Sequence, residues 1–412
     1  MADNNTGQSI LSEASESLRE YISVSAGINV LVSKTKEALS ELREVDTLLT
    51  QIANENDRLS RADLEEIGNN AFDTASKYGK SASDYLTEVQ NASRAGYQNA
   101  AQIAELSLAA QSAGNITGEL ADRFITAADR AYELGGSVAK LTEILDGSFS
   151  ISGRNAISMA ELAEAMSAAG EQASKLGISA DETAAVLSTI ISGAHQSGAE
   201  ASEAFESILL LIRQVADAGK GIDAESLTRY EKACRALNVS LKETKNGVTS
   251  LRDPMEVLKD LSEAYSKLNT GDTRKANLLD AAGSEMNADA LEAVLENYSQ
   301  YEEMLSQYAR GAGSMAQKAA ETADSWEGSL DRLSNTWTDT IGNIADSGAV
   351  ITLVNGLNGL LSVINSITAG LGSFGTIGIG AGLFAGLKNI GKRRTSVRIS
   401  NTVNCFEYAL HA

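Results

Sequence analysis

The chain contains almost no proline. Pro254 is the only one in 412 residues, whereas average usage would give about twenty. Proline breaks helices because it lacks the backbone N–H and clashes with the preceding turn. Aromatic residues make up only 5% of the chain, and Ala, Leu, Glu and Ser are abundant. We therefore expect an all-α protein of elongated helices and helical hairpins, with little compact core.

Residues typical of catalytic and metal sites are also scarce. The two cysteines, Cys234 and Cys405, are too few for a disulfide framework. The two histidines, His195 and His411, lie in no metal-ligand pattern. The glycines of "GTIGIGAGLFAG" lie in an apolar run and do not open a helix after a strand, so they form no dinucleotide fingerprint. We expect no enzymatic activity, no cofactor and no bound metal.

Positive charge is confined to the C-terminus. The net charge is −21. The last 25 residues carry one acid and five basic residues, which leaves −25 on the first 387. The basic residues are Lys388, Lys392, Arg393, Arg394 and Arg398. An acidic body repels nucleic acid, so no specific nucleic-acid partner is expected. The opening "MADNNTGQSILSEASES" is polar and resembles no signal peptide, which favours the cytoplasm as the starting compartment.

Two similar stretches lie 98 residues apart. Residues 62–84 and 160–182 align without gaps with ten identities in 23 positions. Each reads as a helix, a Gly turn and a second helix, and each contains "ASK", a bulky residue, Gly and then Ser-Ala before an acid. The alternative is chance similarity between Ala-rich helices.

The turn chemistry of both stretches favours a real helix–turn–helix repeat. Gly79 and Gly177 suit the left-handed position that follows a helix. Ser81 with Asp84, and Ser179 with Glu182, match the capping box of a new helix. We predict that these six residues form the turns and caps of two helical hairpins.

One short β-hairpin is predicted near residues 238–251. In "VSLKETKNGVTSL" the Asn246-Gly247 pair separates two β-type runs, which is the strongest short hairpin signal. A later stripe that includes Trp326 and Trp337 has helical spacing and is interpreted as helix packing.

Residues 347–387 carry no charge and hold ten glycines. Gly378, Gly382 and Gly386 form a small-xxx-small ladder, the spacing that lets membrane helices approach closely. The length allows one membrane span or a helical hairpin, and burial against protein is the alternative. The basic flank Lys388, Lys392, Arg393 and Arg394 follows.

These patterns divide the chain into six regions. They are a helical lead-in (1–60), a core with both repeats (61–215), a small insertion with the hairpin (216–253), a helical region (254–346), the apolar segment (347–387) and a basic tail (388–412).

The order of these features resembles the tail tape measure proteins of long-tailed bacteriophages and their prophages. The resemblance is carried by "ASKYGKSASDYL", "AAGEQASKLGISADETAAVLSTI", "LRDPMEVLKDLSEAYSKL", "SWEGSLDRLSNTWTDTIGNI" and the Gly-rich run that ends in "GLKNIGKRR". It covers roughly residues 20–394, and the collinear order is more specific than any one motif.

The resemblance implies a structural protein in the lumen of the virion tail, assembled in the host bacterial cytoplasm. Several self-associating copies would set the length of the tail, and apolar segments would help the genome cross the host membrane. The implied partners are the tail tube (major tail) protein, tail assembly chaperones and distal tail or baseplate proteins.

Full-length family members usually continue long past the apolar segment, whereas here "KRRTSVRISNTVNCFEYALHA" stops after about twenty residues. A truncated, non-functional prophage remnant therefore stays open as an alternative. A membrane-active pore-forming or secreted helical protein and a helical adaptor also stay open.

Overall fold

The computed structural model describes residues 37, 40–55, 59–214, 224–245, 248–324, 334, 335 and 338. The chain divides into two compact units, Met1–Leu39 with Ile341–Ala412 and Ser40–Thr340, and the elements below lie in the second. Residues 40–55 are helical. The further elements are α2 (Arg61–Lys77), α3 (Ala82–Arg94), α4 (Ala100–Gly114), α5 (Gly118–Ala131), α6 (Val138–Ser152), α7 (Met159–Lys175), α8 (Ala180–Ala194), α9 (Gly198–Gln214), α10 (Ala224–Ala236), β1 (Lys242–Lys245), β2 (Val248–Leu251), α11 (Pro254–Ser266), α12 (Thr273–Ala281), α13 (Glu285–Glu296), α14 (Tyr298–Ala309) and α15 (Ser314–Ala323). The predictions of a mostly helical chain and of a single short hairpin near 238–251 are confirmed for the described residues.

Glycine and asparagine end several of these helices in place of proline. Gly79, Gly96 and Gly177 have positive φ angles just after α2, α3 and α7, a conformation that glycine adopts without a Cβ clash. Asn115 and Asn238 do the same after α4 and α10, since asparagine tolerates this region better than most residues. The lone proline, Pro254, opens α11, where its missing N–H costs nothing.

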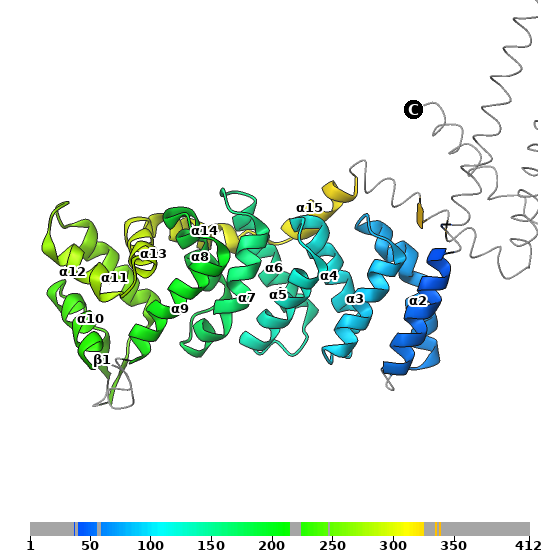
Figure 1. The fold of residues 1–412 in the computed structure, drawn as a ribbon, viewed down its shortest axis with the longest axis horizontal. Helices are drawn as coiled ribbons and strands as arrows, with labels where there is room; N and C mark the ends of the chain where they lie inside the picture. The colour runs from blue at the N-terminus through cyan, green and yellow to red at the C-terminus, as the bar shows by residue number, and fades with distance from the viewer. Residues whose placement is uncertain are drawn as a thin grey trace, which may run out of the picture. The chain divides into compact units, whose positions relative to one another are not determined.

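Helices α4 to α9 form two layers. Helix α7 packs between α5 and α9 in one layer, and α6 packs between α4 and α8 in the other. Consecutive helices alternate between these layers, so the hairpins stack in a row (Figure 1). Helix α2 packs on α4, and α3 packs on α4 and α5, which continues the row.

The last described helices return along the row. Helix α13 packs on α8, α9 and α11, α14 packs on α6 and α8, and α15 packs on α4 and α6 (Figure 1, yellow). The returning helices therefore cover the layer of α4, α6 and α8.

A single hydrophobic cluster runs through this unit, from Val45 to Ala319. Its largest fully buried side chains include Phe124, Phe205, Tyr230 and Tyr265. The expectation of little compact core is therefore wrong. The reason is that many small alanines let the helices approach closely and bury a continuous face on both sides.

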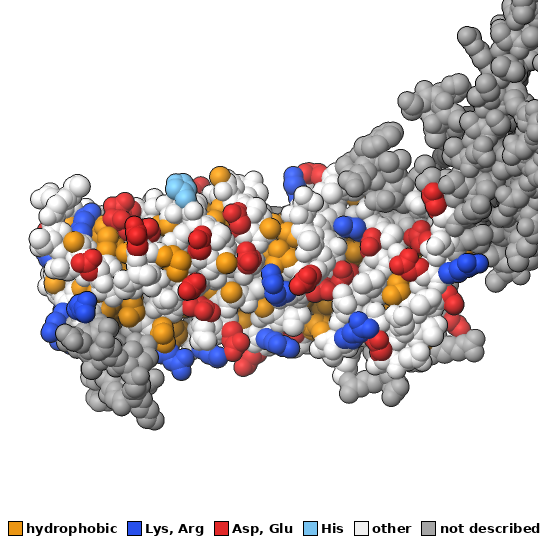
Figure 2. Space-filling model, in the orientation of Figure 1, with side chains coloured by type: hydrophobic (Ala, Val, Ile, Leu, Met, Phe, Trp, Pro, Cys, Tyr) orange, Lys and Arg blue, Asp and Glu red, His pale blue; other side chains and the backbone are white. Residues whose placement is uncertain are grey.

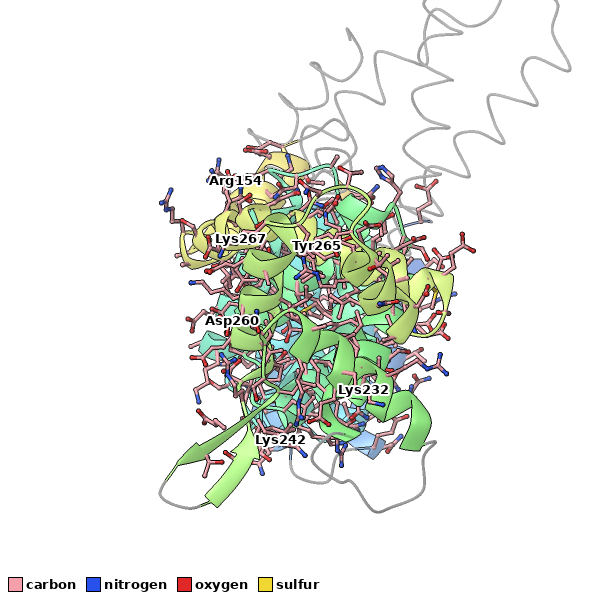
Figure 3. All side chains as sticks on the ribbon, turned by 90° about the vertical axis from the view of Figure 1, so that its left-hand side faces the viewer. Arg154, Lys232, Lys242, Asp260, Tyr265 and Lys267 are labelled. Carbon is pink, nitrogen blue, oxygen red and sulfur yellow. The ribbon has the colours of Figure 1, made fainter. Side chains whose placement is uncertain are left out.

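The hairpin lies at the α10–α12 end of the row. Strands β1 and β2 pair antiparallel, with Lys242 opposite Leu251 and Lys245 opposite Val248. Figure 3 looks at this end, where Lys232 and Lys267 are exposed on α10 and after α11. Tyr265 is buried there, donates to Glu292 at 2.7 Å, and has Lys275 over its ring at 4.0 Å.

The apolar segment 347–387 and the basic tail 388–412 lie outside the described residues. So do Trp326 and Trp337. Within the described part, no helix is both long and apolar enough to span a membrane.

Candidate functional site

The α2–α3 junction ends one helix and starts the next within four residues. Gly79 has a φ of +61°. The N–H of Lys80 donates to the C=O of Ala75 at 3.1 Å, as in a Schellman motif. Ser81 Oγ then accepts from the N–H of Asp84 at 3.1 Å, and the Asp84 carboxylate accepts from the N–H of Ser81 at 3.0 Å. The structure thus places the first three predicted turn residues in one capped turn.

The α7–α8 junction has the same backbone. Gly177 has a φ of +82°, and the N–H of Ile178 donates to the C=O of Ala173 at 3.1 Å. The carboxylate of Glu182 accepts from the N–H of Ser179 at 2.9 Å and from its Oγ at 2.7 Å. In both copies the acid three residues after the capping serine therefore accepts from the backbone N–H of that serine.

Capping boxes also occur where no repeat was recognised. They join Ser60 with Asp63, Ser158 with Glu161, and Ser197 with Glu200. The first two lie before α2 and α7 at the same 98-residue offset, so the similarity extends one cap upstream. A search for Ser-x-x-acid would have found these boxes, whereas residue identity alone did not.

The surroundings of the two junctions differ. At the first, Lys77 and Tyr78 both contact the carboxylate of Glu105 on α4, at 3.1 and 3.0 Å. Burial, and then the charge of Glu105, raises the pKa of the Tyr78 hydroxyl well above its usual range. At the second, Lys175 pairs at 2.6 Å with Glu171 of its own helix. Of the two junction lysines, only Lys77 forms an ion pair with another helix.

Two interacting carboxyl groups, the buried Glu88 and the half-buried Asp122, join α3 to α5. Glu88 is 6% exposed and accepts from Nε2 of Gln111 at 2.8 Å. Asp122 accepts from Ser107 Oγ at 2.7 Å and from Nδ2 of Asn91 at 3.0 Å. Burial, followed by the hydrogen bond and charge of Asp122, raises the pKa of Glu88 to about 8. The pair therefore holds a proton at neutral pH.

A glycine at the start of α5 leaves space for this network. A Cβ at Gly118 would collide with Oε1 of Glu88, so glycine lets α5 begin directly beside the carboxyl group. Sequence reasoning missed the network because nothing in the local pattern singles out these residues among many Glu and Asp side chains.

Asp146 anchors the returning helices. This side chain on α6 is 7% exposed, and its oxygens accept from the N–H groups of Gly313 and Met315 at 2.7 and 2.9 Å. A carboxylate at a helix N-terminus stabilises the free N–H groups and the dipole of α15. Nearby, Ser150 Oγ donates to the C=O of Gln307 at 2.8 Å.

Two clefts on the surface have charged linings, one mainly acidic and one with three arginines. One cleft, of about 1000 Å³, lies beside α2 and the α3–α4 loop and is lined by acids that include Glu55, Asp63 and Glu66. A groove of about 380 Å³ between α3 and α5 is lined by Arg94, Arg123 and Arg130. Acidic side chains occur along the whole length of the described row (Figure 2).

Among the described residues, no group of three or more His, Cys, Asp and Glu side chains could hold a metal ion. His195 is exposed at the end of α8 in the left-handed conformation. Cys234 is buried against Tyr230, and burial raises the pKa of its thiol to about 12. Such a thiol stays protonated and is a poor nucleophile.

The other predicted site residues, Gly378, Gly382 and Gly386 with the basic flank Lys388, Lys392, Arg393 and Arg394, lie outside the described residues.

The sequence was compared with protein families, curated proteins and solved structures. Residues 69–283, just over half of the chain, match the family described as phage-related minor tail protein. The match begins within α2 and ends directly after α12. No curated protein and no solved structure matches.

Proposed function

The chain belongs to the phage-related minor tail protein family, and from this membership we propose that it is a tape measure protein, whose length determines the length of the tail. The observation that supports this most is the coincidence of the family match with the row of stacked helices α2–α12. A tail component that measures length needs extent rather than a reaction centre.

The construction of the row suits this role. Several helices end at a Gly or Asn turn and restart at a Ser-acid cap, and these contacts involve only neighbouring residues. A hairpin whose turns are held by local contacts carries its own helix start and stop signals when it is added or removed. The chain length could therefore change in steps during evolution, as a ruler requires.

The stacked form and the measuring form would differ. A fully helical chain spans about 1.5 Å per residue, so 412 residues give at most about 620 Å. In a tail, the hairpins would open and the chain would lie extended in the lumen. The returning helices α14 and α15 would have to leave the layer that they cover.

The proposed role also includes assembly partners and a part for the apolar segment in genome delivery. Tail tube subunits would polymerise around several copies of the chain, with help from tail assembly chaperones, and baseplate proteins would hold one end. The acidic body would not trap DNA in the lumen, because like charges repel. The segment 347–387 would assist genome delivery at the host membrane.

The test is a change of chain length in the phage or prophage that encodes the protein. Deleting residues 138–175, the α6–α7 hairpin, should shorten the tails by roughly 57 Å if the deleted part is helical in the tail. Duplicating the same residues should lengthen them by as much. Electron microscopy of purified particles measures both.

Leu162→Ala is the matched control, because it weakens the stack and leaves the number of residues unchanged. Its tails should keep their length. If removal of the whole gene left tails of normal length, the tape measure role would be wrong.

A further inference from the structure

The returning helices α14 and α15, here called the return arm, lie very close to the backbone of α6. A Cβ at Gly311, in the turn between them, would come within 2.6 Å of the C=O oxygen of Asp146 and within 2.8 Å of the Cα of Gly147. A Cβ at Gly147 would in turn come within 2.5 Å of the Tyr308 ring. Glycine on both sides of the contact therefore permits this close approach.

Asp146 is a buried carboxylate that binds the return arm with both oxygens. It lies in a stretch of α6, residues 144–151, in which every residue is buried. Its Oδ2 accepts from the N–H of Gly313 at 2.7 Å, and its Oδ1 accepts from the N–H of Met315 at 2.9 Å. These donors lie at the start of α15, where the helix itself offers them no acceptor. With the arm docked, the carboxylate is satisfied by the arm.

Further polar contacts continue along α14. Ser150 Oγ donates to the C=O of Gln307 at 2.8 Å, and Nδ2 of Asn155 donates to Oε1 of the same Gln307 at 2.8 Å. Nearer the start of α14, Nε2 of Gln300 donates to Ser192 Oγ at 3.4 Å. Water can take the place of each partner when the helices separate, so these bonds add specificity and little net free energy.

The apolar part of the contact is limited to one side of the arm. Its large buried side chains are Tyr301, Met304, Tyr308 and Met315. Helix α14 packs mainly on α6 and α8, and α15 packs mainly on α4 and α6, whereas α7 packs on α5, α6, α8 and α9 (Figure 1). The arm can therefore leave the row while the contacts between the two layers of the row remain.

A single residue joins the arm to the rest of the stack. Asn297 follows the last residue of α13 and precedes the first residue of α14. Helix α13 is held on α8, α9 and α11, and the Asn297 side chain donates to the C=O of Ala293 within α13 at 2.8 Å. A change of backbone torsion angles at this junction can therefore move α14 while α13 stays in place.

We propose that the return arm is a releasable strap, which leaves the row as one unit about Asn297 while both layers stay folded, and that Asp146 is the latch that holds it. An apolar side chain at this position would favour the docked state alone. A carboxylate is well solvated once the arm has left, so the same residue suits the docked and the released state. Release exposes the outer side of α4, α6 and α8.

Hydrogen exchange of the full-length chain, followed by mass spectrometry, tests the strap. In the wild type, the amides of α14 and α15 should exchange together and at least about tenfold faster than those of α5 and α7, because the arm opens without the row. Asp146→Ala should raise exchange in both arm helices by a further factor of about ten or more, since hydrogen bonds to charged groups are the stronger ones. Exchange in α5 and α7 should not change.

Two further variants separate the latch from the general fold. Asp146→Asn keeps one acceptor oxygen and should lie between the wild type and Asp146→Ala. Gly147→Ala keeps the carboxylate and places a Cβ against the Tyr308 ring, so it should also raise exchange in the arm alone. Circular dichroism checks that each variant is folded.

Asp272→Ala is the matched control. Asp272 also caps a helix with its carboxylate, which accepts from the N–H of Arg274 at 3.0 Å. The capped helix, α12, packs on α10 and α13 and not on α6. This variant should leave exchange in α14 and α15 as it is in the wild type.

Arm amides that exchange at the same rate as those of α5 and α7 in the wild type would overturn the proposal, because the arm would then open only when the row unfolds. An Asp146→Ala protein in which α15 alone responds, or in which α5 and α7 respond as strongly as the arm, would overturn it as well. The strap does not rest on the tape measure role, because exchange in the isolated chain and the length of a tail are measured separately.

Discussion

The two similar junctions, α2–α3 and α7–α8, share turn and caps, yet their first helices, α2 and α7, lie in opposite layers. Helix α2 packs beside α4, whereas α7 lies between α5 and α9. The 98-residue offset spans α2 to α6, an odd number of helices. Since consecutive helices alternate between layers, the second copy falls into the other layer. The shared sequence therefore encodes a local turn and is not the repeating unit of the stack.

The buried faces of the two copies differ as well. Glu88 of α3 corresponds to Val186 of α8, and both are buried. Leu64 of α2 is half-buried, whereas the corresponding Leu162 of α7 is fully buried. Helices joined by the same turn can therefore bury different side chains. Substitutions at matched positions of the two copies show which effects on stability come from the turn and which come from tertiary packing.

The largest difference is expected at the leucine pair. Leu162→Ala should lower the free energy of unfolding by about 2–5 kcal/mol, because it leaves a cavity between packed helices. Leu64→Ala should cost clearly less, since its site is open to solvent on one side. Urea titration of both variants measures the losses. Equal losses would mean that the two copies are buried alike.

The next effect concerns the interacting carboxyl groups of Glu88 and Asp122. The pKa of Glu88 is raised from 4.5 to about 8, so the folded state holds a proton that the unfolded state releases. The free energy of unfolding should fall as pH rises from about 4.5 to 8, by up to about 5 kcal/mol, since each unit of pKa shift corresponds to about 1.4 kcal/mol. Glu88→Gln should flatten this dependence and be the more stable protein at pH 9.

Urea titration at several pH values gives the slope. The exposed Glu119→Gln serves as the control and should keep the wild-type slope. A Glu88→Gln protein with an unchanged slope would show that the pair is ionised in the folded state.

The turn glycines should give equal, intermediate effects. Gly79→Ala and Gly177→Ala place a Cβ in the left-handed region and should each cost about 1–2 kcal/mol. Asparagine at the same positions should restore part of the loss, as Asn115 and Asn238 already occupy this conformation. Thermal unfolding of the four variants tests this. Clearly unequal losses would mean that tertiary contacts, and not local strain, decide the effect.

The lysines of the two turns should give the smallest effect. Lys77→Met removes a pair with another helix, and Lys175→Met removes a pair within one helix, but both ion pairs are exposed to solvent. Exposed pairs are screened and contribute little. Thermal unfolding at low and high salt should show a small loss that salt abolishes. A loss at Lys77 that persists in high salt would indicate that its stem packs on α4.

Sequence patterns predicted the elements of this protein better than their arrangement. The all-α class and the hairpin followed from propensity and from the Asn246-Gly247 pair, both of which act within a few residues. The turn chemistry of Gly79, Ser81 and Gly177 was readable for the same reason. The continuous core was not predicted, because alanine gives a weak periodic signal although it packs closely.

The candidate sites also differ in whether they depend on neighbouring or on distant residues. A serine followed three residues later by an acid marks a cap in the sequence, whichever helix it meets. The Glu88–Asp122 pair joins residues 34 positions apart in chain order, and the Asp146 anchor binds a helix more than 160 residues away.

The sequence by itself determined where helices stop and restart, because capping and left-handed turns depend on neighbouring residues. It also determined the acidic character of the body and the scarcity of residues for chemistry. The tertiary structure alone decided which layer the first helix of each junction joins, which carboxyl groups are buried, and on which helices the returning helices pack. These outcomes depend on the parity and packing of whole helices, and no stretch of neighbouring residues contains that information.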